Sequence, residues 1–430
     1  MSYDLISPID GRYAPESRPL ARYFSERALA EERVNVELAY LRLLLKLGIA
    51  PKSTVPAIPF SMQRVKTLEK MVGHDVKAVE LFIRESLKER GSSKLGPFVH
   101  LGLTSEDTNS LAYGRLLSSA LARVIVPEYR RLVMDLVNLA QREAGTKMLA
   151  RTHGRPALPT TFGKEVAVFA VRLAERTAAL RKLKPAGKFS GAVGTFASFC
   201  LISRQDWPKV LADFVSGMGL DYTPYTTQVV PGERLSDILH LVVNVNQLVV
   251  SLSRDLWMYQ TLDYVHFRRP GMVSSSTMPQ KVNPVDLENA EGQAEISSAI
   301  LSMIAYRLQV TRMQRDLSDS VIRRMVGQGL AHSFIACKRL RTSLSALEVD
   351  RRRMGRDLLG HPEVYAEALQ LSMRLAGDER GYEKVRKLAE SGRLPRPPRS
   401  LRRAGGYLGL SKALAEGCRA EVARILAIPD

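Results

Sequence analysis

The sequence predicts an all-α protein with a central bundle of long helices. Apolar residues recur at helical spacing over several stretches of 20 residues or more, strand signals are few, and Pro- and Gly-rich segments separate the helical stretches. At 430 residues the chain is too long for one compact core, so we expect several domains. We place them at residues 1–108, 109–345 and 346–430, the last two being the long-helix bundle and a small helical domain.

Two long helices are expected in the first half of the chain. The first is expected over residues 116–144, with a kink near Pro127 because proline lacks a backbone N–H. The second is expected over residues 161–183, where apolar positions at steps of three, four and seven residues form one helical face. These positions are Phe162, Val166, Phe169, Leu173 and Leu180.

Two further helices are apolar on more of their surface. Residues 234–259 contain neither Gly nor Pro and are apolar on nearly all sides, and residues 288–309 form another Gly-poor stretch. Helices of this kind need more apolar partners than one small bundle offers. We therefore expect them to be buried between subunits of a homo-oligomer.

Composition limits the class of protein. The net charge of +19 suits either nucleic acid or small anions, but the basic stretch at residues 393–403 has no interleaved aromatic residues, so nucleic-acid binding is not expected. The three cysteines, Cys200, Cys337 and Cys418, are far apart and suggest neither a zinc site nor disulfides. No uncharged apolar stretch of membrane-spanning length and no secretory signal are evident, so we expect a cytoplasmic protein without a membrane span.

The most distinctive segment is SSSTMPQKVNPVDLE at residues 274–288. It combines three consecutive serines, two prolines, Lys281 and Asn283, and it precedes a long helix. Neither core packing nor a simple linker needs this pattern. A small, polar loop carrying a lysine can instead close over an anionic substrate and exclude water.

This segment resembles the signature of the fumarase/aspartase superfamily, and the rest of the chain resembles the bacterial branch of the adenylosuccinate lyase family. The resemblance covers about residues 3 to 350 and weakens after that. Its segments follow one another in the family's order. They are SPIDGRY (7–13), GHDVKAVE (73–80), TSEDTNS (104–110), RTHGRPALPTTFGKE (151–165), SGAVGT (190–195), YTTQVVPGE (225–233) and QRDLSDSVIRR (314–324).

The resemblance implies a fumarase/aspartase-like three-domain fold and a homotetramer whose sites combine loops from three subunits. It implies elimination of fumarate from adenylosuccinate, giving AMP, and from succinylaminoimidazole carboxamide ribotide, giving aminoimidazole carboxamide ribotide. We expect no metal and no cofactor. Such an elimination needs a base, a group that stabilises the developing dianionic carboxylate, and an acid for the leaving nitrogen.

The resemblance also assigns the catalytic residues. Ser275 stands at the position of the family's base, and its alkoxide would need nearby positive charge, for which Lys281 is a candidate. His153, in the turn RTHGRP, is the expected general acid, since an imidazole titrates near neutrality. His74 is expected to orient His153 or to bind phosphate.

The expected substrate-binding residues fall into two groups. Thr104 and Ser105 would bind a carboxylate of the fumarate part together with Lys281 and Asn283, and Gln228 would contact the succinyl part. The second group would bind the nucleotide and its phosphate, for which guanidinium groups are suited. Its members are Arg12, Tyr13, His100, Arg315, Ser320 and Arg324.

Two positions depart from the family pattern and leave alternatives open. Gln280 stands where the family usually has a histidine, and a glutamine at this position resembles the argininosuccinate lyase family instead. Arg155 stands where the family usually has a glutamine, beside His153. An arginine there would lower the imidazole pKa or add an anion contact. The alternatives are an argininosuccinate lyase, another lyase of the superfamily, or a non-catalytic relative. The phosphate-directed segments and the retention of Ser275 and His153 disfavour them.

Overall fold

The computed structural model describes residues 4–268, 278, 281–395 and 407–427, and over these residues the fold is α-helical with a few short strands. This confirms the predicted fold class. The chain forms two compact units. Unit 1 comprises Met1–Pro127, Ala179–Asn246 and Gln293–Ile335, and unit 2 comprises Glu128–Ala178, Gln247–Gly292 and Ala336–Asp430. The division into three domains at residues 108 and 345 stays a prediction.

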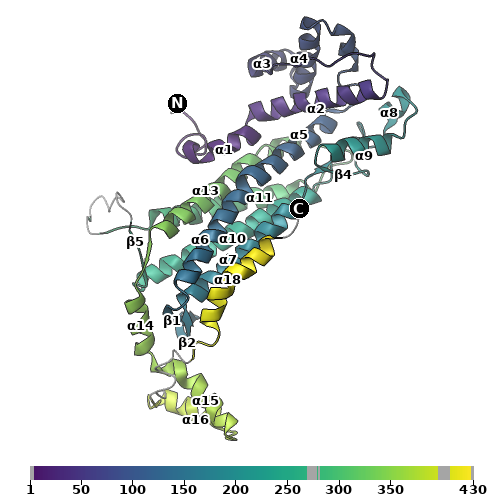
Figure 1. Cartoon of the computed structure of the whole chain (residues 1–430). Coiled ribbons are helices and arrows are strands. Elements are labelled where there is room, and N and C mark those ends of the chain that lie inside the picture. Colours follow the sequence, from purple (N-terminus) through teal and green to yellow (C-terminus); the bar gives the residue numbers. More distant parts are fainter. Residues whose placement is uncertain (1–3, 269–277, 279–280, 396–406, 428–430) are drawn as a thin grey trace. The chain divides into compact units, whose positions relative to one another are not determined.

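Unit 1 begins with helices that pack on one another: α2 packs on α3, α4 and α5, and α1 packs on α2 and α5 (Figure 1). Side chains before the helices satisfy free backbone N–H groups, as Ser25 does at the start of α2, accepting from Ala28 N at 3.2 Å. The bounds are α1 (Ala14–Phe24), α2 (Glu26–Lys46), α3 (Met62–Val72), α4 (Asp75–Glu89), η1 (Ser93–Phe98) and α5 (Ser105–Ala120).

Aromatic side chains form the centre of the unit 1 core. Tyr40 and Phe199 both pack against Phe189, at 5.1 and 6.2 Å between ring centroids, and Trp207 lies 5.2 Å from Phe199. The Tyr40 hydroxyl donates to the backbone O of Leu101 at 3.0 Å, so burying this phenol leaves no unpaired donor. Further short elements contribute here: β3 (Ala186–Gly187), α8 (Ala197–Ile202), α9 (Trp207–Gly217) and β4 (Asp221–Tyr222).

The long helices lie where the sequence predicts them. Residues 161–183 form α7 (Phe162–Lys182), residues 234–259 form α10 (Glu233–Thr261), and residues 288–309 lie largely in α11 (Val285–Arg307). Residues 116–144 are helical across α5, the π-helical turn η2 (Leu121–Ile125) and α6 (Val126–Arg142). The irregular turn directly precedes Pro127, near the position of the expected kink.

The core of unit 2 is formed by parts of these long helices. Side chains from α6, α7, α10 and α13 (Val326–Ser345) surround a cavity of only ≈ 10 Å³, which shows close packing. They are Leu132, Leu136, Phe169, Leu173, Leu248, Val249, Leu252 and Leu340. By its length and composition alone α10 could span a membrane, but a core helix passes the same test, and 56% of its apolar window is buried.

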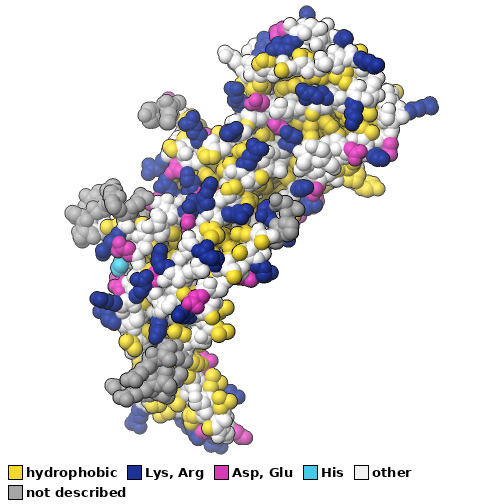
Figure 2. All heavy atoms as spheres, viewed as in Figure 1, with side chains coloured by type: hydrophobic (Ala, Val, Ile, Leu, Met, Phe, Trp, Pro, Cys, Tyr) yellow, Lys and Arg dark blue, Asp and Glu magenta, His cyan; other side chains and the backbone are white. Residues whose placement is uncertain are grey.

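The last part of unit 2 is a set of shorter helices. Leu149 of β1 (Lys147–Thr152) packs with Leu358 and Val364, so the start of this region contacts a strand of the same unit. The bounds are β5 (Val265–Phe267), β6 (Leu347–Val349), α14 (Arg351–Gly360), η3 (Pro362–Tyr365), α15 (Ala366–Leu375), α16 (Gly381–Glu390) and α18 (Ser411–Leu426). On the face seen in Figure 2, Lys and Arg side chains are spread among acidic ones and do not form one basic patch.

Candidate active site

The N-terminus of α5 is built around a capping box. Thr104 is the N-cap residue, and the backbone N–H of Thr104 donates to Oδ2 of Asp107 at 2.9 Å. Ser105 is the first residue of the helix. The TSED pattern explains this geometry, because a hydroxyl three residues before a carboxylate satisfies two free N–H groups reciprocally. The predicted carboxylate-binding pair, Thr104 and Ser105, therefore sits at a rigid helix start.

The second oxygen of Asp107 serves another segment. Its Oδ1 lies 2.9 Å from Nζ of Lys188 and accepts from the backbone N–H of Ser190 at 3.0 Å. The Lys188 ammonium also donates to the backbone O of Gly191 at 2.7 Å and of Gln228 at 3.0 Å. Both charged side chains are completely buried. This ion pair therefore connects three predicted site segments: TSEDTNS, SGAVGT and YTTQVVPGE.

A chain of polar contacts runs from α4 to α5. Nη2 of Arg33 lies 2.9 Å from Oδ2 of Asp75, and Nε of Arg33 donates to Oδ1 of Asn109 at 2.8 Å. Asn109 in turn donates to Oε1 of Glu106 at 2.6 Å. Arg33, Asn109 and Glu106 are all buried, so the hydrogen bonds among these groups replace those that each would make with water.

Arg315 continues this chain to Gln228. Its guanidinium lies 3.2 Å from Oε1 of Glu106, donates to Oε1 of Gln228 at 3.3 Å and contacts Oδ1 of Asp319 at 3.3 Å. The Gln228 side chain is thus oriented with its oxygen toward Arg315. Two predicted substrate-binding residues are in direct contact here, which the sequence did not indicate.

His74 and Arg324 both lie beside Asp75 at the start of α4. His74 is the N-cap residue, and its Nδ1 accepts from the backbone N–H of Lys77 at 3.2 Å, which leaves Nε2 as the donor of a neutral imidazole. Nη2 of Arg324 lies 2.9 Å from Oδ2 of the adjacent Asp75. Burial raises the pKa of Asp75, but the charge and hydrogen bond of Arg33 and the hydrogen bond of Arg324 outweigh it, so the pKa is lowered.

His100 faces a buried carboxylate. Its Nδ1 lies 2.7 Å from Oε1 of Glu37, which also accepts from the Thr108 hydroxyl at 2.6 Å. The backbone of His100 has a positive φ of 59°, a conformation that few residues other than Gly adopt. Burial lowers the pKa of His100, but the hydrogen bond and charge of Glu37 outweigh it and raise the pKa above its ordinary value.

Three other predicted residues lie on the surface of unit 1. Residues Ser7–Tyr13 fold into a turn in which Gly11 N donates to Ser7 O at 3.2 Å, and this turn carries the exposed Arg12 and the half-buried Tyr13 into α1. Ser320 is half-buried in α12 (Ser318–Arg323), the short helix that ends directly before Arg324. Their place in a site stays a prediction.

His153 belongs to unit 2 and occupies a hairpin. β1 (Lys147–Thr152) and β2 (Arg155–Thr161) pair antiparallel, and His153 and Gly154 form the turn with φ angles of 52° and 71°. Positive φ at both positions is typical of a type I′ turn. The His153 side chain and the neighbouring Arg155 are exposed. The sequence located this turn correctly but did not predict the two strands around it.

The signature loop is described only in part. Ser275 and Gln280 lie outside the described residues. Lys281 is exposed and Asn283 is half-buried, and both precede α11, with the Lys281 N–H donating to Met278 O at 3.0 Å. The roles of these residues stay predictions.

Unit 1 therefore gathers six predicted residues along connected contacts: His74 beside Asp75, Thr104, Ser105, Gln228, Arg315 and Arg324. Sequence reasoning missed the residues that connect them, which are Arg33, Glu106, Asp107, Asn109 and Lys188. The motif TSEDTNS already contained three of these five. Among the described residues, no group of three His, Cys, Asp or Glu side chains is placed to hold a metal ion.

Solved structures of two other enzymes share this fold. The 3-carboxy-cis,cis-muconate lactonizing enzyme of Pseudomonas putida superposes with a TM-score of 0.76 at 21% identity, covering 95% of this chain and 97% of the other. A fumarate lyase of a Mesorhizobium species gives a TM-score of 0.72 at 20% identity, covering 96% and 98%. Residues 22–296 match the family model described as Lyase, so the chain belongs to a lyase family.

The particular family follows from more similar sequences. Residues 311–397 match the model described as adenylosuccinate lyase C-terminal. The adenylosuccinate lyase of Haemophilus influenzae is 37% identical over 90% of this chain and 89% of its own length. That of Escherichia coli is 36% identical over 91% and 90%. The chain belongs to the adenylosuccinate lyase family.

Proposed function

We propose that this enzyme eliminates fumarate from adenylosuccinate to give AMP, and from succinylaminoimidazole carboxamide ribotide to give aminoimidazole carboxamide ribotide. Membership of the adenylosuccinate lyase family supports the reaction class. The observation that carries the proposal is the contact between Arg315 and Gln228 at 3.3 Å. It places a predicted nucleotide-binding cation beside the predicted succinyl-binding amide.

The reaction breaks the bond between nitrogen and the succinyl carbon and removes a proton from the neighbouring carbon, which bears a carboxylate. In our proposal Ser275 accepts that proton, and His153 donates a proton to the leaving nitrogen. Lys281 and Asn283 stabilise the dianionic carboxylate that develops, together with the hydroxyls of Thr104 and Ser105. These roles need no electron transfer and are all filled by amino-acid side chains.

Support for the binding roles comes from the electrostatics of unit 1. Arg33 and Arg324 both contact Asp75, so one carboxylate offsets part of two guanidinium charges. Arg315 is shared between Glu106 and Asp319. The guanidinium groups are thus held in fixed positions near the N-termini of α4 and α5, where the helix dipoles favour a phosphate or carboxylate.

We further propose a homotetramer with composite sites in the cytoplasm. The exposed position of His153 at a hairpin tip suits a residue that completes a site in another subunit. Exposed apolar residues on the long helices suit burial between subunits. Among them are Trp257 and Met258 of α10 and Ile296, Met303 and Tyr306 of α11. The substrates we propose are small nucleotides, and we propose no nucleic-acid or membrane partner.

One ultraviolet assay tests the function. Purified full-length protein should convert adenylosuccinate to AMP and fumarate without added metal, and a chelator should leave the rate unchanged. Argininosuccinate, offered in parallel, should not react. Turnover of argininosuccinate alone would identify the rival lyase, and failure to turn over either substrate by a folded protein would contradict the proposal.

A further inference from the structure

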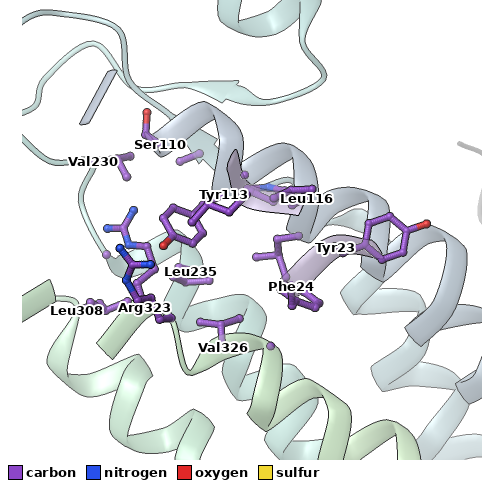
Figure 3. A pocket seen from close by; sticks show the side chains of 18 of the residues that line it. Tyr23, Phe24, Ser110, Tyr113, Leu116, Val230, Leu235, Leu308, Arg323 and Val326 are labelled. Carbon is purple, nitrogen blue, oxygen red and sulfur yellow. The ribbon is translucent and has the colours of Figure 1, made fainter. Parts of the chain in front are cut away.

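Unit 1 contains a cavity of ≈ 270 Å³ that none of the predicted catalytic residues lines. Its walls come from α1, α5, α10, α12 and α13, and most of the lining is apolar, including Phe24, Leu116, Leu235 and Val326 (Figure 3). A dry cavity of about 150 Å³ with similar walls accepts a benzene molecule. This larger cavity therefore has room for a phenyl ring with a short side arm.

One charged side chain at this cavity lacks hydrogen-bond partners. Arg323, the last residue of α12, has a side chain that is only 10% exposed, and its guanidinium lies 5.6 Å from the ring centre of Tyr113. The carboxylate nearest to it is that of Asp319 at 3.9 Å, which is too long for a hydrogen bond. Nε of Arg323 has no partner among the described residues. A buried guanidinium whose N–H groups have no acceptor favours the binding of an anion nearby.

The other charged side chains that line the cavity are already paired. Glu26 pairs with Lys66, and Arg324 pairs with Asp75. The Ser110 hydroxyl is bonded to the backbone O of Lys188 at 3.0 Å. Asp319 itself is shared with Arg315 at 3.3 Å. Arg323 is therefore the charged group at this cavity whose donors are available to a ligand.

We propose that this cavity binds a monocarboxylate whose apolar body is the size of a phenylalkyl group. The carboxylate accepts from the Arg323 guanidinium, whose planar donors match two carboxylate oxygens. The apolar body lies toward Phe24 and Tyr23, which Figure 3 shows on the side of the cavity away from Arg323. One proposed nucleotide contact, Arg324, also lines the cavity, but its guanidinium contacts Asp75 and leaves the Arg323 donors to the monocarboxylate.

Calorimetric titration of the full-length protein with 3-phenylpropionate tests this proposal. Arg323→Met keeps an unbranched aliphatic stem but removes the charge, and it should weaken binding by about tenfold or more, as expected for a lost charge-assisted hydrogen bond. Leu235→Phe narrows the cavity and should weaken binding. Arg64→Met serves as the matched control, because Arg64 is a surface residue paired with Glu85, and it should bind like the wild type.

Ligand analogues and a competitor separate the contributions. Neutral 3-phenylpropanamide should bind about tenfold more weakly, since it lacks the charge, and acetate should not bind measurably, since it lacks the apolar body. Saturating AMP should leave 3-phenylpropionate binding in place. Equal affinity of wild type and Arg323→Met, loss of binding with AMP, or no binding by folded wild-type protein at millimolar ligand would each overturn the proposal.

Discussion

Nζ of Lys188 lies 2.9 Å from Oδ1 of Asp107, and neither side chain has any exposed surface. Each partner has further hydrogen bonds, from Lys188 to the backbone O of Gly191 and from Thr104 N to Asp107. A buried ion pair is favourable only when such additional bonds satisfy both charges. The pair holds the start of α5 against the SGAVGT segment, which makes it a positioning element for the residues that we propose bind substrate.

Removing the lysine charge should destabilise unit 1. Lys188→Met leaves the Asp107 carboxylate buried without its cation, which typically costs about 3–5 kcal/mol in the free energy of unfolding. Urea unfolding can be followed by Trp207 fluorescence in a Trp257→Phe background, because the chain has two tryptophans. Lys209→Met, on the surface of α9, is the control and should change stability by about 0.5 kcal/mol at most. A loss below about 1 kcal/mol for Lys188→Met would contradict this account.

Arg315 should contribute to substrate affinity. Arg315→Met removes the guanidinium that orients Gln228 and adds to the local positive charge, so we expect kcat/KM for adenylosuccinate to fall about tenfold or more. Steady-state kinetics measures this effect. Arg312→Met changes an exposed arginine three residues away and should leave kcat/KM near the wild-type value. Similar kinetics for both variants would exclude a binding role for Arg315.

The pair of His100 and Glu37 should make stability depend on pH. The pKa of His100 is raised in the folded state, so its contribution is fully present below the unfolded pKa of about 6.5. It is lost as the pH rises through the higher folded pKa, at about 1.4 kcal/mol for each unit of elevation. Urea unfolding between about pH 6 and pH 9 should therefore show wild type losing stability relative to His100→Gln. A stability difference that stays constant over this range would refute the assignment.

Catalytic roles and composite sites can be tested together. Ser275→Ala and His153→Ala should each abolish turnover, since one removes the proposed base and the other the proposed acid. Mixing the two inactive variants under conditions of subunit exchange should restore part of the activity, because some sites then combine intact residues from different subunits. Sizing before mixing checks assembly. Continued inactivity after demonstrated exchange would count against composite sites, and activity of Ser275→Ala alone would move the base to another residue.

Local sequence patterns determined the helices. Apolar spacing of three and four residues placed residues 161–183 in a helix, and an apolar stretch without Gly or Pro placed residues 234–259 in another. The structure shows them as α7 and α10. The TSED pattern likewise specified the capping box of Thr104 and Asp107, since all the groups involved lie within four residues. The seven family-like segments indicated the lyase family for the same reason, because each is read within a short stretch of chain.

Tertiary structure alone decided which distant groups meet. Lys188 reads as an ordinary lysine, and its pairing with Asp107 depends on the packing of β3 against α5. The strands around His153 were also missed, because Pro156 and Pro159 disfavour a strand at β2, which is stabilised by its antiparallel pairing with β1. The spacing of apolar residues along the chain encodes whether a backbone segment prefers to be a helix or a strand. Partner choice for a buried charge depends instead on which segments exclude water together, and no local pattern contains that information.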